Sequence, residues 1–313
     1  MTAYNTLLLR LEGPFQAWGL PEARFAVRRV APCPTKSGVI GLLCAAMGIA
    51  RPEATPETLK PLAELKMAVR VDRPGVRWLD YHTVGAGMDR RTAGGDMRRS
   101  ETMLTLREYL GDASFLVALW GEPETIQKLY DALRNPVWPL YLGRKSCVPS
   151  VPLLLDRTIP ESAEAGDGKG QVQVSSLRAA ANPLEALAKV PWQPRYFFEK
   201  KAPEALDVYT DWPLPGNGRE EYVELQAARD VPVHFLPPVP AYESRVVARL
   251  KLRCGAGEGE IPVWDKPLYS LPKAPERPQA DYTNTEYRRI RKARLRQDHG
   301  LCVFCKAPAT TVQ

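Results

Sequence analysis

The chain has 313 residues, of which 44% are hydrophobic and 25% are charged, a composition typical of a globular protein and not of a disordered or fibrous one. Its formal net charge of +7 favours polyanionic partners such as nucleic acid, although charge alone does not identify one. No apolar run approaches the length of a transmembrane helix, and the apolar core of the N-terminus is too short for a signal peptide, so we expect a cytoplasmic protein without a membrane partner.

The first half of the sequence predicts alternating strands and helices. A short apolar run predicts a strand from Asn5 to Leu11. A helix is expected to begin at Thr35 or Ser37, capped by a hydroxyl, and to end at Gly48. The remaining predicted elements are strands over 67–71, 115–120 and 151–155 and a helix from Pro123 to Leu133. The order strand, helix, strand, strand, helix, strand is that of an α+β, ferredoxin-like (RRM-like) domain.

A long excursion, residues 78–110, separates the second and third predicted strands. Its middle is rich in glycine and carries Arg90, Arg91, Arg98 and Arg99. Two apolar arms around a polar tip predict a projecting β-hairpin. Arginines on a flexible arm suit a clamp for a phosphate backbone, while a solvated loop is the alternative for a basic run taken alone.

The second half of the sequence is less regular. Residues 161–170 are rich in glycine and charge and predict a disordered turn. Beyond Asn182 the sequence is rich in proline and only weakly periodic, with a last strand expected over 246–252. We therefore expect a main domain over 1–252, a linker over 253–281 and a separate segment over 282–313.

Two short motifs suggest contacts with phosphate or RNA. Pro34 to Gly38 lacks the upstream glycines of a Walker loop, but Lys36 beside a helix N-terminus could bind a single phosphate. The segment from Tyr141 to Ser146 combines an aromatic ring, a glycine, Arg144 and Lys145. A base can stack on the ring while the cations hold the flanking phosphates, and an ordinary turn at a strand end is the alternative.

Tyr81-His82-Thr83 is the one segment that suggests acid–base chemistry. Histidine and tyrosine can move the proton of an RNA 2′-hydroxyl. The chain has only three histidines, His82, His234 and His299, which argues against a ribonuclease site built from two of them. A histidine next to a tyrosine also fits a purely structural role.

Five blocks in order, over most of residues 4–155, resemble the CasD family of the RAMP superfamily. They are residues 9–19, 34–43, 80–84, 107–115 and 141–147, and the similarity resumes at 227–232. The resemblance implies a ferredoxin-like RAMP domain with a thumb-like hairpin. It also implies that the chain binds the 5′ handle of a crRNA within a type I-E CRISPR Cascade complex, which serves antiviral defence. The implied partners are the backbone, large and crRNA-processing subunits of Cascade, with target DNA reached through the complex.

The resemblance further implies a subunit without catalytic residues, because another Cascade subunit cuts the precursor RNA. The implied RNA contacts are Arg28, Arg29, Lys36, Arg107, Tyr141, Arg144 and Lys145, followed by Arg90, Arg91, Arg98 and Arg99 in the thumb. A related branch of the family trims precursor crRNA itself, so an endoribonuclease using Tyr81 or His82 is the alternative. A basic scaffold without an RNA role is a third possibility, which the ordered blocks disfavour.

The tail from Tyr287 to Cys305 departs from this family and resembles the start of an HNH endonuclease domain. In that family a pair such as Cys302 and Cys305 holds a structural zinc together with a second cysteine pair, and catalytic residues follow around a separate divalent metal. No second pair occurs before Gln313. The sequence is then either part of a longer fusion with a metal-dependent DNA nuclease, or its tail only binds nucleic acid. Enzymatic activity depends on which alternative holds.

Overall fold

The computed structural model describes residues 4–20, 27–84, 90–91, 97–98, 103–160, 171–194, 201–213, 224–236, 239–255 and 260–263. All of these residues belong to the first of the two units into which the chain divides, Met1–Pro267 and Leu268–Gln313. The predicted turn at 161–170, most of the linker and the whole tail lie outside the described residues, so the predicted domain boundaries stay predictions. None of the helices in the described ranges has the length and apolarity needed to cross a lipid bilayer.

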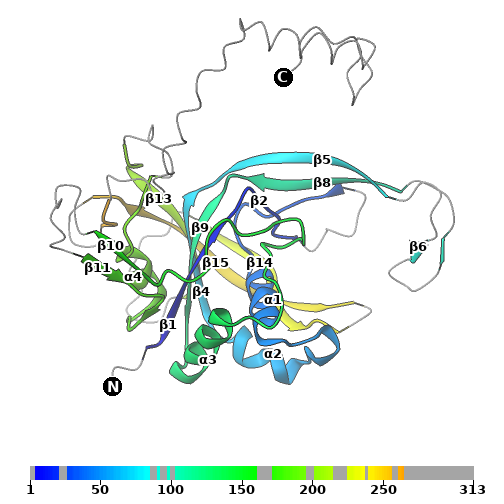
Figure 1. Cartoon of the computed structure of the whole chain (residues 1–313), viewed down its shortest axis with the longest axis horizontal. Helices are drawn as coiled ribbons and strands as arrows, with labels where there is room; N and C mark the ends of the chain where they lie inside the picture. Colours follow the sequence, from blue (N-terminus) through cyan, green and yellow to red (C-terminus); the bar gives the residue numbers. More distant parts are fainter. Residues whose placement is uncertain are drawn as a thin grey trace, which may run out of the picture. The chain divides into compact units, whose positions relative to one another are not determined.

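A seven-stranded antiparallel sheet forms the centre of the unit, with the strand order β12-β1-β9-β4-β13-β15-β14 (Figure 1). Its strands are β1 (Thr6–Glu12), β4 (Lys66–Arg73), β9 (Ser114–Trp120), β12 (Leu177–Arg178), β13 (Ala205–Asp211), β14 (Glu224–His234) and β15 (Ala241–Arg253). Every residue of β1 is buried, as expected for a strand that is covered on both faces.

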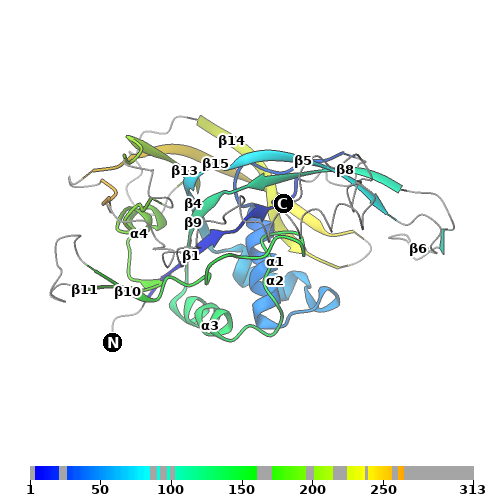
Figure 2. The same cartoon turned by 45° about the horizontal axis from the view of Figure 1, so that its top comes forward.

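Helices cover both faces of this sheet. Alternate residues of β1 divide between two cores, because successive side chains of a strand point to opposite faces: Leu7 and Leu9 pack with α1, α2 and α3, whereas Leu8 packs with α4. The helical elements are α1 (Lys36–Met47), η1 (Arg51–Glu53), α2 (Pro56–Ala63), α3 (Pro123–Arg134) and α4 (Pro183–Ala188). Figure 2 shows α1, α2 and α3 grouped on one side of the sheet.

The caps of α1 follow the prediction. Thr35 is the N-cap, and its hydroxyl accepts a hydrogen bond from the backbone N–H of Gly38. Gly48 ends the helix at a φ of 76°, in the left-handed region that glycine adopts without steric cost.

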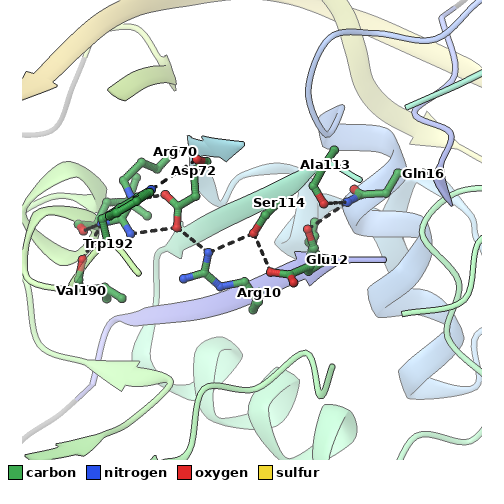
Figure 3. Close-up of polar contacts among 11 residues, drawn as sticks. Arg10, Glu12, Gln16, Arg70, Asp72, Ala113, Ser114, Val190 and Trp192 are labelled. Atoms are coloured by element: carbon green, nitrogen blue, oxygen red, sulfur yellow. Dashed lines mark hydrogen bonds and ion pairs between the residues drawn. The ribbon is translucent and has the colours of Figure 1, made fainter. Parts of the chain in front are cut away.

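The face of the sheet that carries α4 also holds a buried polar cluster (Figure 3). Arg10 pairs with Asp72 and donates to the Ser114 hydroxyl, which in turn donates to Glu12 at 2.8 Å. Arg70 also pairs with Asp72 and donates to two carbonyls at the C-terminal end of α4, both at 2.6 Å. Burial opposes the ionisation of Asp72, but the two arginines outweigh it and hold the pKa of this carboxyl below its usual value. The cluster thereby joins three central strands to α4.

One predicted strand is wrong in extent. Residues 151–155 contribute only an isolated bridge, Leu9 to Leu154, and the edge beside β1 is completed by β12. The succession β1, α1, β4, β9, α3 follows the predicted order, and the predicted last strand over 246–252 lies within β15. β13 and β14, which were not predicted, flank β15 in the sheet. The architecture is a mixed α/β fold with antiparallel sheets.

A second, four-stranded sheet carries the predicted hairpin. It consists of β2 (Phe15–Gln16), β3 (Val27–Arg28), β5 (Val76–Val84) and β8 (Met103–Gly111), with β8 between β5 on one edge and β2 and β3 on the other. β5 and β8 form an antiparallel ribbon that leaves the body of the unit (Figure 1). The prediction of a hairpin is confirmed. Two further pairs of short strands complete the elements: β6 (Arg90–Arg91) pairs with β7 (Met97–Arg98), and β10 (Arg157–Pro160) pairs with β11 (Gln171–Val174).

Candidate nucleic-acid interface

The loop from Tyr141 to Cys147 is fixed in shape by its glycine. Gly143 has a φ of +100°, and a Cβ at this position would lie 1.9 Å from the carbonyl oxygen of Ala17. The Ala17 N–H donates to the Leu142 carbonyl at 2.9 Å, and the Leu142 N–H donates to the Cys147 carbonyl at 2.7 Å. The loop is therefore held against the segment that follows β2, and only glycine allows so close an approach.

Buried hydrogen bonds support that segment from below. Gln16 and Trp18 are both fully buried. The Gln16 side-chain amide donates to the carbonyls of Leu11 and Ala113, and the Trp18 indole N–H donates to the Gln16 side-chain oxygen at 3.0 Å. Much of the block over 9–19 thus serves the fold rather than contacting a ligand directly.

Arg144 ties this loop to the second sheet. Its guanidinium donates to the Glu108 carbonyl at 2.7 Å and to the Arg28 carbonyl at 3.3 Å. The same guanidinium lies 4.6 Å from the centroid of the Tyr109 ring, within cation–π range. Arg144 therefore holds β3 and β8 together at the point where the loop meets them.

A second set of contacts fixes the residues after β3. The Glu108 carboxylate accepts a hydrogen bond from the Val30 N–H at 3.1 Å and pairs with Arg77 at 3.0 Å. Arg77 in turn donates to the Val30 carbonyl at 3.1 Å. Together with Arg144, these contacts anchor both ends of the segment from Arg28 to Val30.

The strand register sorts the ribbon into two chemically different faces. Trp78 lies opposite Tyr109, Asp80 opposite Arg107, and Arg28 of β3 also opposite Arg107. Residues that are directly opposite each other share a face, as do alternate residues of one strand. We call the face formed by Phe15, Arg28, Trp78, Arg107 and Tyr109 the cationic–aromatic face. The other face of the ribbon carries the exposed side chains of Val27, Leu79, Tyr81 and Leu104.

The aromatic side chains of the cationic–aromatic face contact one another. Phe15 meets Trp78 and Tyr109 edge-on, with ring centroids 6.2 Å and 5.8 Å apart. The Nε atom of Arg28 is buried and has no hydrogen-bond partner among the described residues. The face thus combines exposed rings with guanidinium groups, a combination that suits stacked bases and phosphates.

Most of the predicted RNA contacts lie together at this interface. Arg28 and Arg107 lie on the cationic–aromatic face, Arg144 covers its edge, and Arg29, the residue after β3, is exposed. The adjoining loop contributes a half-buried Tyr141 and an exposed Lys145. Arg90, Arg91 and Arg98 lie in β6 and β7, which form a separate two-stranded sheet between β5 and β8 in the chain, and Arg99 is outside the described residues.

Lys36 does not belong to this interface, contrary to the prediction. Its side chain is buried, and its ammonium lies 3.3 Å from the Asp211 carboxylate. Its backbone N–H donates to Asp230 at 2.7 Å, so a carboxylate of the protein occupies the N-terminus of α1, where a phosphate was expected. Burial lowers the pKa of Lys36, and the attraction of Asp211 only partly offsets this effect.

The same contacts give a structural role to residues 227–232, where the resemblance to the CasD family resumes. A register shift in β14 between Ala228 and Val231 brings Asp230 toward the helix. Asp230 also pairs with Arg245 at 2.7 Å, and Arg245 pairs with Asp211. These ion pairs join the β14–β15 hairpin to α1 and β13.

His82 has an acidic neighbour on the ribbon. Its Nδ1 atom lies 3.4 Å from the Asp80 carboxylate, and the register places both side chains on the same face as Arg107. Tyr81 points to the other face. The two residues considered for catalysis therefore cannot act together at one site on this ribbon, whereas His82 can act with Asp80 and Arg107.

The described cysteines are poor metal ligands. Burial raises the pKa of Cys33 to about 12 and that of Cys44 to about 11, and it also raises the pKa of Cys147 and Cys254, which disfavours the thiolate form that binds metals. Among the described residues, no group of three or more histidines, cysteines and carboxylates is placed to hold a metal ion. Cys302 and Cys305 lie outside these residues.

Several residues of the interface carry no clear signal in the sequence. Phe15, Trp78, Tyr109 and Glu108 were not predicted to belong to it. The alternation of Trp78, Asp80 and His82 along one strand is visible in the sequence, but the partner of each residue depends on a register that the intervening segment sets.

Comparisons with known proteins identify the family of this chain. The model of a family described as CRISPR-associated protein (Cas_Cas5) matches residues 6–247. The chain is 44% identical over 162 residues to the CRISPR system Cascade subunit CasD of Escherichia coli K12, covering 48% of this chain and 69% of that protein. A chain of a solved CRISPR RNA-guided surveillance complex is similar with a TM-score of 0.56 and 33% identity, over 80% of this chain and 91% of that one. A second solved structure, of a Cas protein, gives a TM-score of 0.50 and 34% identity, over 79% and 95% of the two chains. The chain therefore belongs to the Cas5 family of CRISPR-associated proteins.

Proposed function

We propose that this chain is the Cas5 (CasD-type) subunit of a type I-E Cascade surveillance complex and binds the 5′ handle of the crRNA through the cationic–aromatic face. The observation that carries the proposal is the gathering of Arg28, Arg107, Arg144 and Tyr109 at one side of the β5–β8 ribbon. The similarity to a Cascade subunit and to a chain of an RNA-guided surveillance complex supports the choice of RNA as the ligand.

A protein that binds unpaired RNA needs two kinds of contact. Its phosphates are held by cations, and its bases stack on aromatic rings or on guanidinium planes. Arg29 and Lys145 are exposed beside the face and suit phosphates, because such contacts require little fixed geometry. Arg28 and Arg107 are half-buried and suit contacts in which the direction of the hydrogen bond matters.

In this proposal the neighbours of the subunit are the backbone, large and crRNA-processing subunits of Cascade, and target DNA is reached through the complex. The elements from β1 to α3 form the ferredoxin-like RAMP part, and the β5–β8 ribbon is its thumb. The complex acts in the cytoplasm in antiviral defence.

The proposal is tested by RNA binding at several salt concentrations. Arg29→Ala together with Lys145→Ala should weaken binding of handle RNA and reduce the slope of log K against log salt by about 0.7 for each phosphate that the variant no longer binds. Lys128→Ala, an exposed lysine on α3, is the control and should leave the slope unchanged. Equal binding of handle RNA and of spacer RNA by the wild-type chain would contradict the proposal. Arg144 is a poor test residue, because its loss would also release β3 from β8.

A second candidate function is cleavage of precursor crRNA. It is favoured by the pairing of His82 with Asp80 on the same face as Arg107, since a histidine can take the 2′-hydroxyl proton and a cation can stabilise the phosphate in the transition state. Cleavage of repeat RNA by the purified chain, abolished by His82→Ala and by a 2′-deoxy substitution at the scissile nucleotide, would establish this function. Intact RNA after incubation with the wild-type chain would exclude it.

We also propose that the tail is a zinc-binding segment at the start of an HNH nuclease domain. Two thiolates separated by two residues supply half of a tetrahedral zinc site, and Cys302 and Cys305 have this spacing. The basic residues that precede them suit a nucleic-acid backbone. A complete domain of this kind, with its own divalent metal, would make the protein a nuclease that cuts guided target DNA.

A further inference from the structure

We infer that Trp78 is a stacking platform for one unpaired base of the bound RNA. This inference rests on the proposed RNA-binding function and assigns to the site a residue whose role is distinct from that of the cations. The position of the indole ring, its neighbours and its exposure all support this role.

The inner side of the indole ring is fixed by the protein. A Cβ at Gly111 would lie 2.7 Å from two atoms of the ring, so the ring covers the backbone of β8 at a position where only glycine leaves room. Phe15 meets the ring edge-on, with an interplanar angle of 83°. The ring is thus oriented before any ligand binds, and little side-chain entropy remains to be lost on binding.

The outer side of the ring is open. Trp78 is 58% exposed and Phe15 is 41% exposed, although both rings contact each other. An aromatic ring of this size, supported on one side and open on the other, is well placed to stack on a flat ligand such as a base. The next residue pair on the same face of the ribbon is Asp80 and Arg107, so a base on Trp78 would place its backbone beside a guanidinium group.

The neighbours favour a base over a protein side chain as the occupant. Tyr109, opposite Trp78, is covered by the Arg144 guanidinium, and Arg28 and Arg107 share the same face. A protein partner would have to neutralise or desolvate these cations, whereas RNA carries a phosphate with every base. The other face of the ribbon exposes Leu79 and Tyr81, and its charged residues Arg77 and Glu108 already pair with each other, so that face suits a protein contact better.

The experiment compares handle RNA binding by full-length Trp78→Ala, Trp78→Phe and Trp138→Ala, measured by fluorescence anisotropy over a series of salt concentrations. Trp138 is 41% exposed and follows α3, outside the cationic–aromatic face, so it serves as a matched control. Trp78→Ala should lose about 5- to 100-fold in affinity at every salt concentration with an unchanged salt slope, because stacking releases no counterions. Trp78→Phe should recover most of the affinity, and Trp138→Ala should bind like the wild type.

Wild-type affinity of Trp78→Ala would overturn the inference alone and would leave the ring as a protein contact. A fall in affinity with a smaller salt slope would also overturn it, since that pattern indicates that the variant binds fewer phosphates. If the wild-type chain does not bind the RNA, the proposed function fails together with the inference.

A measurement on the wild-type chain guards against variants that fold poorly. Ultraviolet cross-linking to the same RNA, followed by mass spectrometry, should place a nucleotide adduct on Trp78. Tyr81, three residues away and on the other face of the ribbon, should carry none. An adduct on Tyr81 without one on Trp78 would contradict the inference.

Discussion

At the scale of single residues, Gly143 sets the conformation of the loop that presents Lys145. We predict that Gly143→Ala lowers the free energy of unfolding by at least about 1–3 kcal/mol, the cost of a left-handed backbone without glycine, with the contact to Ala17 adding to it. Handle RNA affinity should fall as well, because the loop would move. Gly19→Ala is the matched control, since a Cβ there meets no atom within 4 Å. Equal urea denaturation curves for the two variants would show that the loop does not depend on Gly143.

The contribution of Asp211 to the stability of the fold depends on pH in a direction that its contacts define. Burial opposes its ionisation, but Arg245 and Lys36 outweigh burial and hold its pKa below the usual value. Its contribution to stability is therefore complete above the pKa of the unfolded chain, about 4, and is lost as the pH falls through the lower pKa of the folded state. Asp211→Asn should lower the free energy of unfolding by about 3–5 kcal/mol at pH 7, because the buried Lys36 ammonium would lose its carboxylate partner and Arg245 would keep only Asp230.

The pH dependence separates this mechanism from a loss of packing. The difference between the wild type and Asp211→Asn, measured by urea denaturation, should shrink as the pH is lowered below about 4. A difference that stays constant down to pH 2 would mean that the charge of Asp211 is not what stabilises the fold.

At the scale of elements, the proposed RNA contacts of Arg28 and Arg29 depend on the position of β3 against β8. Glu108→Ala removes the carboxylate that holds the Val30 N–H and Arg77. We predict a loss of about tenfold in RNA affinity, in line with about 1.5 kcal/mol for a hydrogen bond to a charged group. Simple electrostatics predicts the opposite sign, since the substitution removes a negative charge near a polyanion. Glu57→Ala on α2 is the control for net charge, and tighter binding by Glu108→Ala would refute the positioning role.

The elements that could be predicted from the sequence are those with local signals. α1 has its hydroxyl cap and its terminal glycine, α3 has Pro123 in its first turn, and β1, β4 and β9 are short apolar runs. α2, β13 and β14 were missed. The prolines at positions 56 and 61 obscure the helical pattern of α2. In β13 and β14 the alternation of apolar and polar residues is interrupted by Asp211 and Asp230, which form their ion pairs only in the folded chain.

The interface could be predicted only in part for a related reason. The family resemblance predicts Arg28, Arg107 and Lys145 as RNA contacts, and the structure places the first two on the cationic–aromatic face and Lys145 in the adjoining loop. Lys36 has the same chemistry, but its burial against Asp211 depends on contacts between residues 175 positions apart. The aromatic half of the face depends on the pairing of β5 with β8, and no local signal gives that register.

At the scale of the whole molecule, zinc binding by the tail and the proposed RNA binding by the unit Met1–Pro267 are expected to be independent. The natural gene product should contain zinc. The double substitution Cys302→Ser with Cys305→Ser should remove this zinc, because the four cysteines among the described residues are held as thiols by burial. Handle RNA affinity should be unchanged in the same variant. Metal analysis of the purified protein is the measurement. Zinc retained by the double variant would place the metal elsewhere.

The central claim is that this subunit holds the 5′ end of a crRNA with the cationic–aromatic face. The most direct test is to isolate the tagged protein from its native cells after ultraviolet cross-linking and to sequence the RNA attached to it. The account predicts cross-links concentrated in the repeat-derived nucleotides at the 5′ end, joined to peptides of β5, β8 and the 141–147 loop. Cross-links spread over the spacer, or confined to peptides outside these elements, would contradict it.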